Sequence, residues 1–100
     1  MTRLLSDEEV ERQLQGLPAW SRDGDAIVAR LKAPDFLTGI RLVDEAAEAA
    51  EQMDHHPDID IRWRTTTWRL STHSEGGLTQ LDIELAHQIS QAAERLGVRP

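Results

Sequence analysis

The sequence predicts an α+β domain of two layers, in which three helices cover one face of a four-stranded antiparallel sheet. Three segments carry apolar residues at helical spacing, and four shorter segments alternate apolar and polar residues as strands do. The short segments fall into two adjacent pairs, which indicates two hairpins and the order α-β-β-α-β-β-α. The 100 residues suit a single domain that covers residues 1–100.

The first predicted helix covers residues 6–15. Ser6 and Glu9 have the spacing of a capping box, in which each side chain accepts a hydrogen bond from the backbone of the other residue. Gly16 follows as the candidate residue that ends the helix.

The segment from Trp20 to Lys32 is predicted to form the first hairpin. Asp23-Gly24 is a favoured pair for a two-residue turn, because glycine adopts a positive φ at no steric cost. The second arm of the hairpin then places one set of apolar side chains on a single face, namely Ile27, Ala29 and Leu31.

A long helix is predicted to open with Pro34 and Asp35, to run to about Met53 and to end before Pro57. Proline is tolerated in the first turn, where its missing N–H has no partner in the helix. One apolar stripe is expected to pack against the rest of the domain, formed by Phe36, Ile40, Val43, Ala47 and Ala50.

The second hairpin is predicted after Pro57. The alternating set lies on odd positions in Ile59, Ile61 and Trp63, and on even positions in Trp68, Leu70 and Thr72. Since a strand keeps one parity on each face, the change of parity predicts a turn near residues 64–66.

Residues 74–77 are predicted to form a loop before the last helix. Thr79 and Asp82 resemble a second capping box, with aspartate in place of glutamate. Gly97 is expected to end this helix, and the residues after it are expected to fray. The apolar face of the helix is formed by Leu85, Ile89, Ala92 and Leu96.

The composition narrows the class of protein. The formal net charge is −7 and no basic stripe is present, which argues against nucleic acid as a direct partner. The sequence has no cysteine, so disulfides and thiolate metal sites are excluded. Because no signal peptide is recognisable and no apolar run approaches the roughly 20 residues that span a bilayer, we expect a cytoplasmic protein without a membrane partner.

Three of the four histidines lie in two short segments, Asp54-His55-His56-Pro57 and Ser71-Thr72-His73. Adjacent histidines after a helix could serve only as a C-terminal cap, which the helix dipole favours. They could also hold a metal ion together with neighbouring aspartates. The metal interpretation is disfavoured, because adjacent side chains in an extended segment point to opposite sides and no His-x-x-x-His pair is present. His87 lies off the apolar stripe of the last helix and is interpreted as structural or solvated.

The third interpretation is acid–base chemistry without a metal. His55 and His56 precede the third strand and His73 follows the fourth, so an antiparallel hairpin brings the two segments to one end of the sheet. Histidine as a residue type titrates near neutral pH and can there give or take a proton. Pro57 fixes the backbone beside the adjacent pair, and the glycines at 76 and 77 allow the loop backbone to approach a flat ligand.

Taken together, these motifs resemble the pterin-4a-carbinolamine dehydratase family. The resemblance is carried by Glu51-x-x-Asp54-His55-His56-Pro57, by Thr72-His73, and by Gly77-Leu78-Thr79-x-x-Asp82. It covers residues 4–96. The implied fold is a four-stranded antiparallel sheet with three helices on one side, as in the element order above. The family forms dimers or dimers of dimers, so a homodimer or homotetramer is implied.

The resemblance implies an enzyme, a hydro-lyase that dehydrates 4a-hydroxytetrahydrobiopterin to quinonoid dihydropterin during recycling of the cofactor of aromatic amino acid hydroxylases. His56 and His73 carry over as the proton-transfer pair, and His55 carries over as the catalytic residue that positions the substrate hydroxyl. Which member of the pair is acid and which is base stays open. Asp82 is expected to orient His73 or to hold the pterin ring. The residues implied in substrate binding are Glu51, Asp54, Pro57, Thr72 and Asp82.

The same resemblance leaves a second function open. Family members can act as dimerisation partners of transcription factors, and some bacterial relatives have assembly or chaperone-like roles, so a protein-binding or coactivator-like role is the alternative. The implied partners are the pterin substrate and an aromatic amino acid hydroxylase, linked by function. Neither a cofactor nor a metal is expected, because the pterin is the substrate. The chain departs from animal members at Ile59 and at Trp63-Arg64, where they carry an aromatic residue and tyrosine-asparagine.

Overall fold

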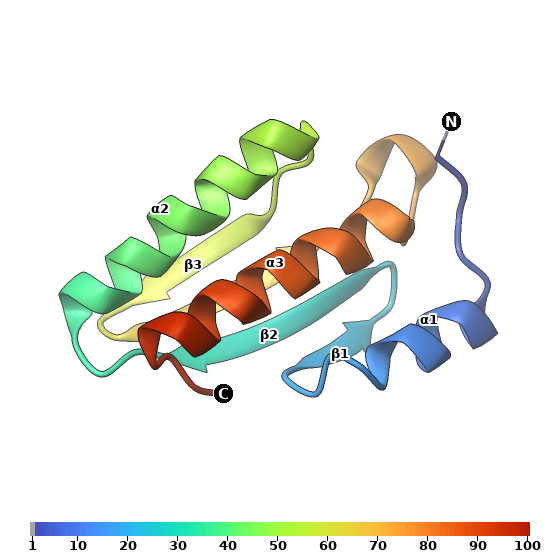
Figure 1. The fold of residues 1–100 in the computed structure, drawn as a ribbon. Coiled ribbons are helices and arrows are strands. Elements are labelled where there is room, and N and C mark those ends of the chain that lie inside the picture. The colour runs from blue at the N-terminus through green and yellow to red at the C-terminus, as the bar shows by residue number, and fades with distance from the viewer. Residues whose placement is uncertain (1) are drawn as a thin grey trace.

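The computed structural model of the chain describes residues 2–100 and has the predicted order of elements (Figure 1). Within those residues, no helix is long and apolar enough to cross a membrane. The elements are α1 (Asp7–Leu14), β1 (Trp20–Asp23), β2 (Ala26–Lys32), α2 (Phe36–Met53), β3 (Asp58–Arg62), β4 (Thr65–Leu70), the short 3₁₀ turn η1 (His73–Glu75) and α3 (Gln80–Leu96).

The four strands form one antiparallel sheet in the order β1-β2-β4-β3, and the helices lie on one side of it (Figure 1). Ala29 of β2 pairs with Trp20 of β1 on one side and with Trp68 of β4 on the other. Trp68 in turn pairs with Ile59 of β3. The predicted α+β fold is therefore confirmed, with β1 and β3 as the two edges of the sheet.

The hydrophobic core lies between the sheet and the helices. Trp68 at the centre of β4 is fully buried, and its indole N–H donates to the Thr66 hydroxyl over 2.9 Å. Leu42 of α2 and Ile89 of α3 are also fully buried. Burial of each large apolar side chain contributes about 1.5–3 kcal/mol, so the core fixes the ends of the strands and helices on which the site is built.

Both predicted capping boxes are present at helix N-termini. The Ser6 hydroxyl accepts a hydrogen bond from the backbone N–H of Glu9 over 3.1 Å, and the Glu9 carboxylate accepts one from the Ser6 N–H over 2.9 Å. Thr79 and Asp82 form the same reciprocal arrangement at the start of α3. Each box provides acceptors for helix N–H groups that have no partner inside the helix.

The helix C-termini agree with the predictions only in part. Gly97 ends α3 in a left-handed conformation with φ of 73°, as predicted. Helix α1 ends at Leu14 and is capped by Gln15 in a right-handed conformation, so it stops before Gly16 as predicted, but Gly16 does not adopt a left-handed conformation. The C-terminal residues are not frayed either, because Arg99 and Lys32 exchange two backbone hydrogen bonds of 2.6 and 2.9 Å.

The first hairpin turn lies one residue later than predicted. Asp23 pairs with Ala26, so the turn residues are Gly24-Asp25. Gly24 has a φ of 61°, a left-handed value that glycine adopts without steric cost. The Asp-Gly signal therefore identified the hairpin correctly but not the two residues at its tip.

The second hairpin turn also differs from the prediction. Arg62 pairs with Thr65, so the turn is Trp63-Arg64 and not residues 64–66. Trp63 has a φ of 55°, which is unfavourable for a bulky side chain. Its ring stacks on Phe36 at the start of α2, with ring centroids 6.1 Å apart and planes inclined by 12°.

The predicted packing stripe of α2 is wrong by a rotation of the helix. Of the five predicted residues only Ala50 is buried; Phe36 and Ala47 are exposed, and Ile40 and Val43 are half-buried. The predicted stripe is a second apolar face that the domain leaves partly open. The face that packs into the core is formed by Gly39, Leu42, Ala46 and Ala50.

Candidate active site

The C-terminal turn of α2 determines where His55 and His56 point. Asp54 adopts a left-handed conformation with φ of 50°, and its N–H donates to the carbonyl groups of Ala50 and Glu51. The His55 N–H also donates to the Ala50 carbonyl, over 3.0 Å, which is the Schellman type of helix end. After this sharp turn, the His55 side chain is buried and the His56 side chain is exposed. The backbone of His55 therefore takes part in the C-terminal cap of α2, as one interpretation of the sequence expected, whereas its ring does not.

The His55 ring is held by a carboxylate from the first turn of α3. Its Nε2 atom lies 2.6 Å from Oδ1 of Asp82, and the two residues are only 8% and 0% exposed. The second carboxylate oxygen accepts hydrogen bonds from the Thr72 hydroxyl over 2.8 Å and from the Thr79 N–H over 2.9 Å. A buried carboxylate needs such partners. Asp82 was expected to orient His73, but the histidine that its carboxylate contacts is His55.

Asp82 also joins the two histidine segments to each other. Through its two oxygens it contacts His55, which precedes β3, and Thr72, which follows β4. Continuing the antiparallel register of β3 and β4 past its end sets His55 opposite Thr72. Since His73 is the next residue, the two segments meet at one end of the sheet, as the sequence predicts.

His73 lies in a short loop that the backbone closes. Thr72 and Gly77 exchange two backbone hydrogen bonds of 2.8 and 3.3 Å, and His73 starts the 3₁₀ turn between them. The His73 side chain is exposed. A Cβ atom on Gly77 would lie 3.1 Å from Cδ2 of Leu4. Gly77 therefore permits the N-terminal segment to pack closely on this loop. The sequence had suggested that the absence of a side chain here lets a ligand approach the backbone.

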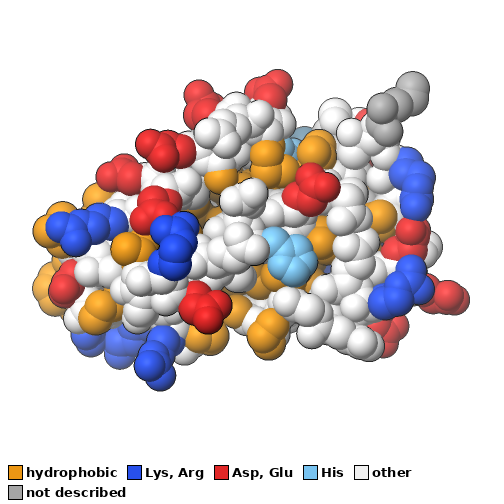
Figure 2. Space-filling model, viewed as in Figure 1, with side chains coloured by type: hydrophobic (Ala, Val, Ile, Leu, Met, Phe, Trp, Pro, Cys, Tyr) orange, Lys and Arg blue, Asp and Glu red, His pale blue; other side chains and the backbone are white. Residues whose placement is uncertain are grey.

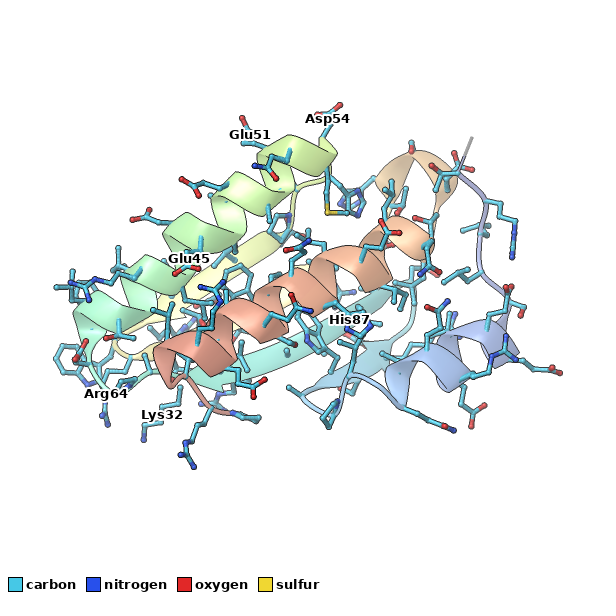
Figure 3. All side chains as sticks on the ribbon, viewed as in Figure 1. Lys32, Glu45, Glu51, Asp54, Arg64 and His87 are labelled. Carbon is cyan, nitrogen blue, oxygen red and sulfur yellow. The ribbon has the colours of Figure 1, made fainter. Side chains whose placement is uncertain are left out.

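His56 has an acidic partner of its own. Its Nε2 atom is hydrogen bonded to Oε2 of Glu51 in the last turn of α2. The two side chains are 56% and 75% exposed, and an exposed pair of this kind contributes at most about 1 kcal/mol. Figure 3 shows Glu51 and Asp54 at the C-terminal end of α2. The half-buried Pro57 follows His56 and directly precedes β3.

The fourth histidine lies apart from this site. His87 is exposed on α3, on the side that faces α1 (Figure 3). It lines a surface cleft of about 770 Å³ between α3, the loop after α1 and the C-terminal segment. His55, His56 and His73 do not line that cleft.

Within residues 2–100, no three side chains of the His, Asp or Glu type are placed to hold one metal ion. The expected absence of a metal stays a prediction of the sequence.

The sequence did not indicate Thr79 as part of the site. Its hydroxyl lies 2.7 Å from the Thr72 hydroxyl and is fully buried. A capping box with Asp82 is visible in the sequence, but by itself it predicts only the start of a helix. The contact of Thr79 with Thr72 crosses the loop that closes at Gly77, and Asp82 connects the pair to His55, 27 residues earlier in the chain, so no helix or strand pattern reports these contacts.

The arrangement provides three imidazoles in two different settings. His55 is buried and fixed by a carboxylate, whereas His56 and His73 are exposed and open to exchange protons with a ligand or with water. One fixed ring beside two exposed rings suits general acid–base chemistry on a bound small molecule.

The fold and this histidine site define a small α+β domain with a candidate acid–base site at one end of its sheet. The chain belongs to the family described as Pterin 4 alpha carbinolamine dehydratase, which matches residues 3–92.

The relatives have the same description. A protein from Nocardia farcinica, provisionally named pterin-4-alpha-carbinolamine dehydratase, is 59% identical over 92 residues, which cover 92% of this chain and 97% of that protein. A protein of the same provisional name from Mycobacteroides abscessus is 54% identical over 86 residues, which cover 86% of this chain and 92% of that protein.

A solved structure is similar as well. The crystal structure of a transcriptional coactivator/pterin dehydratase from Brucella melitensis superposes with a TM-score of 0.86 at 34% identity. The superposition covers 89% of this chain and 97% of that chain. Family and relatives together support a pterin carbinolamine dehydratase.

Proposed function

We propose that this chain dehydrates 4a-hydroxytetrahydrobiopterin to quinonoid dihydropterin. The observation that supports the proposal is the buried carboxylate of Asp82, which fastens His55 and the segment that carries His73 to one point. His56 is the residue next to His55, so all three imidazoles belong to one small region. In the proposal the pterin is the substrate, and the chain uses no other cofactor and no metal.

The proposed reaction needs one proton donor and one proton acceptor. The bond from C4a to the hydroxyl oxygen breaks, the C4a=N5 double bond forms, and N5 loses its proton. Hydroxide leaves poorly, so an acid must protonate the departing oxygen, which is released as water. One proton is given and one is taken, so the step involves no oxidation or reduction. A pair of histidines fits this exchange, each contributing about 10²–10⁴-fold.

The exposed histidines are proposed as the proton-transfer pair, with His56 oriented by Glu51. His55 is proposed to hold the substrate hydroxyl, since its buried ring has a fixed orientation. Asp54 and Pro57, which flank the two adjacent histidines, are proposed as contacts at the rim.

Thr72 and Asp82 are buried, and the Thr72 hydroxyl donates to the Asp82 carboxylate. We therefore propose that they act on the substrate through the orientation of His55.

Stopped-flow measurement of 4a-hydroxytetrahydrobiopterin breakdown tests the proposal. The variants His56→Ala and His73→Ala are expected to lower kcat by about 100-fold or more. His87→Ala is the matched control, because it removes an exposed histidine from the other side of α3. Unchanged rates in both site variants would show that the catalytic assignment is wrong.

A protein-binding role, of the coactivator type, is the second candidate. The similar protein from Brucella melitensis is named a transcriptional coactivator as well as a pterin dehydratase. An exposed apolar surface of this chain, which we call the outer patch, would suit such a role: Phe36, Leu37, Ile61 and Trp63 are 48%, 59%, 42% and 73% exposed. Absence of turnover in the wild-type chain, together with a stoichiometric partner that Trp63→Ala no longer binds, would favour this role over the enzyme.

For the chain as an enzyme, we propose that a second copy of the chain covers the outer patch in place of a foreign partner, in a homodimer or homotetramer. β3 is an edge strand beside the patch, so its unpaired backbone groups can accept a further strand. The half-open stripe of α2 starts in the same patch, at Phe36. Figure 2 shows acidic side chains over α2 and basic side chains at the end of the molecule where α2 begins, which gives a copy complementary charges to align on.

Sedimentation equilibrium tests the proposed assembly. The wild-type chain of 11.3 kDa is expected at two or four times its own mass. Ile61→Arg, which places a charge inside the patch, is expected to sediment as the monomer with an unchanged circular dichroism spectrum. A monomeric wild type would contradict the assembly without bearing on the chemistry.

The proposed cellular role is the recycling of tetrahydropterin for an aromatic amino acid hydroxylase in the cytoplasm. A strain lacking this chain is expected to show slower hydroxylation at the same level of hydroxylase. Restoration by the wild-type chain and not by His73→Ala would tie that effect to the proposed activity.

A further inference from the structure

Among residues 2–100, five polar or charged residues are buried, and four of them form one continuous hydrogen-bonded chain. Thr66 is apart, because its hydroxyl accepts from the Trp68 indole. The continuous chain joins hydroxyl, hydroxyl, carboxylate and imidazole through contacts of 2.7, 2.8 and 2.6 Å. Its members, in order, are Thr79, Thr72, Asp82 and His55.

The direction of every hydrogen bond in this chain follows from the groups involved. An ionised carboxylate only accepts, so the single hydroxyl proton of Thr72 is donated to Oδ2 of Asp82. Thr72 then has no proton left for the contact with Thr79, so Thr79 must be the donor there. The Thr79 oxygen in turn accepts from the Leu81 N–H over 3.3 Å, in the first turn of α3.

The same reasoning assigns the proton of the buried imidazole. Oδ1 of Asp82 accepts from Nε2 of His55, so Nε2 carries a proton in the neutral ring as well as in the charged ring. Nδ1 is therefore the nitrogen that remains to accept a hydrogen bond from the substrate or to exchange a proton with it. A carboxylate that fixes a histidine tautomer in this way is a general device of acid–base sites.

We propose that Thr79 is a positioning residue for the dehydration: through Thr72 and Asp82 its hydroxyl holds His55 in the tautomer that presents Nδ1 to the substrate. This inference rests on the proposed function only for its effect on rate. The residue sits at the start of α3, so the same side chain begins a helix and orders a catalytic ring. Loss of the hydroxyl removes the donor to Thr72, so the buried Thr72 oxygen is left without that hydrogen bond and the Asp82 carboxylate is held less firmly.

A purely structural role of Thr79 as a helix cap is the competing explanation, and the chain contains its own control. Ser6 caps α1 through the same type of box, far from the histidines in the sequence and on the surface. Ser6→Ala therefore removes a cap without touching the site. Thr72→Val does the reverse, because it breaks the hydroxyl chain and leaves the box of Thr79 and Asp82 intact.

The test combines ¹⁵N NMR of the histidine rings with kcat measured against pH. In the wild type, His55 is expected to show a protonated Nε2 and an unprotonated Nδ1. Thr79→Val and Thr72→Val are expected to give a mixture of tautomers, with kcat lower by about tenfold and KM changed by less than about twofold. Thr79→Ser, which keeps the hydroxyl, is expected to restore both readouts, and Ser6→Ala to change neither.

Two results would overturn the inference. One is a wild-type tautomer of His55 in both valine variants. The other is a loss of kcat in Ser6→Ala as large as that in Thr79→Val, since both would then report a weaker helix. If Thr79→Val fails to fold, Thr72→Val alone decides. Absence of turnover in the wild type would overturn the proposed function, whereas the NMR readout of the tautomer would still support or contradict this inference.

Discussion

The two capping boxes of the molecule have the same construction and different surroundings. In α1 one oxygen of Glu9 accepts from the Ser6 N–H over 2.9 Å, and the other accepts from the Arg3 guanidinium over 2.7 Å. In α3 one oxygen of Asp82 accepts from the N-cap N–H over 2.9 Å, and the other contacts the His55 ring over 2.6 Å. In both boxes the acid caps the helix and also holds a basic side chain, which Glu9 does with both of its oxygens and Asp82 with one.

The difference between the boxes is burial. Arg3 is exposed and Glu9 is partly so, and water screens their interaction, whereas Asp82 is fully buried and His55 nearly so. An exposed pair of this kind contributes little and can be replaced by water, but a buried carboxylate without its partners has no alternative. The same local motif therefore fastens the N-terminal segment in one place and defines the protonation of a catalytic ring in the other.

Asp82→Asn is expected to have the largest effect, because it changes the buried capping box at the atom that contacts His55. An amide nitrogen directed at His55 would donate to Nε2, so the ring would move its proton to Nδ1. We expect kcat to fall by about 100-fold and the free energy of unfolding to fall by about 2 kcal/mol. Stopped-flow kinetics and urea denaturation measure the two effects.

Glu9→Gln is the matched control for that substitution, because it makes the same chemical change in the exposed box. Its kcat is expected to equal that of the wild type. Equal losses of rate in the two variants would mean that the carboxylate of Asp82 has no role beyond its helix.

Removal of the N-cap hydroxyl from each box gives the second prediction. Ser6→Ala is expected to lower the free energy of unfolding by about 1 kcal/mol, the usual effect of losing a cap. Thr79→Ala is expected to lower it by about 2–3 kcal/mol, since the buried Thr72 hydroxyl also loses its donor. Urea denaturation of both variants measures the difference, and equal values would show that the link to Thr72 adds nothing to stability.

Local features of the molecule follow from the sequence, and contacts between distant segments do not. Both capping boxes, the left-handed Gly97 and the order of elements depend on residues within a few positions of one another. The partner of Asp82 is different, because it depends on how α3 lies against the end of α2. The family resemblance therefore implied that Asp82 belongs to the site, where it was expected to orient His73 or to hold the pterin ring, but it did not indicate the contact with His55.

Two further errors have the same origin. Helix α2 carries apolar residues on two faces, and periodicity cannot tell which face the sheet covers; Leu42 is buried and Val43 is not. The second hairpin turn contains Trp63-Arg64, neither of which is a favoured turn residue. Parity identified the hairpin, but the left-handed Trp63 is sustained by stacking on Phe36, a contact from another part of the chain.

The two adjacent histidines also form one buried and one exposed pair with acidic side chains, which gives a second comparison of burial. Glu51 and His56 form an exposed pair beside the buried pair of His55 and Asp82. Glu51→Gln is expected to lower kcat by only about threefold, because water and salt compete for the exposed carboxylate. The expected loss becomes smaller at high salt, which stopped-flow assays at two ionic strengths measure. A loss as large as that of Asp82→Asn would mean that Glu51 takes part in the chemistry itself.

The smallest expected effect concerns the exposed capping box of α1 at acidic pH. The hydrogen bond from the Arg3 guanidinium, followed by that from the Ser6 backbone, lowers the pKa of Glu9 to about 2 from an ordinary value of 4.5. A depressed carboxyl pKa contributes stability above the unfolded value, and that contribution is lost as the pH falls from about 4.5 to about 2. Glu9→Gln is therefore expected to have a slightly lower Tm than the wild type at pH 6, with the difference vanishing near pH 2.

Thermal unfolding followed by circular dichroism over this pH range measures the difference between the two proteins. The hydrogen bonds from Thr38 also lower the pKa of Asp35, but that contribution is the same in both proteins and cancels. Glu8→Gln removes a charge from the same turn without touching the capping box, so it separates net charge from the box. A difference in Tm that persists at pH 2, or that Glu8→Gln reproduces, would show that the difference does not come from the interaction of ionised Glu9 with Arg3.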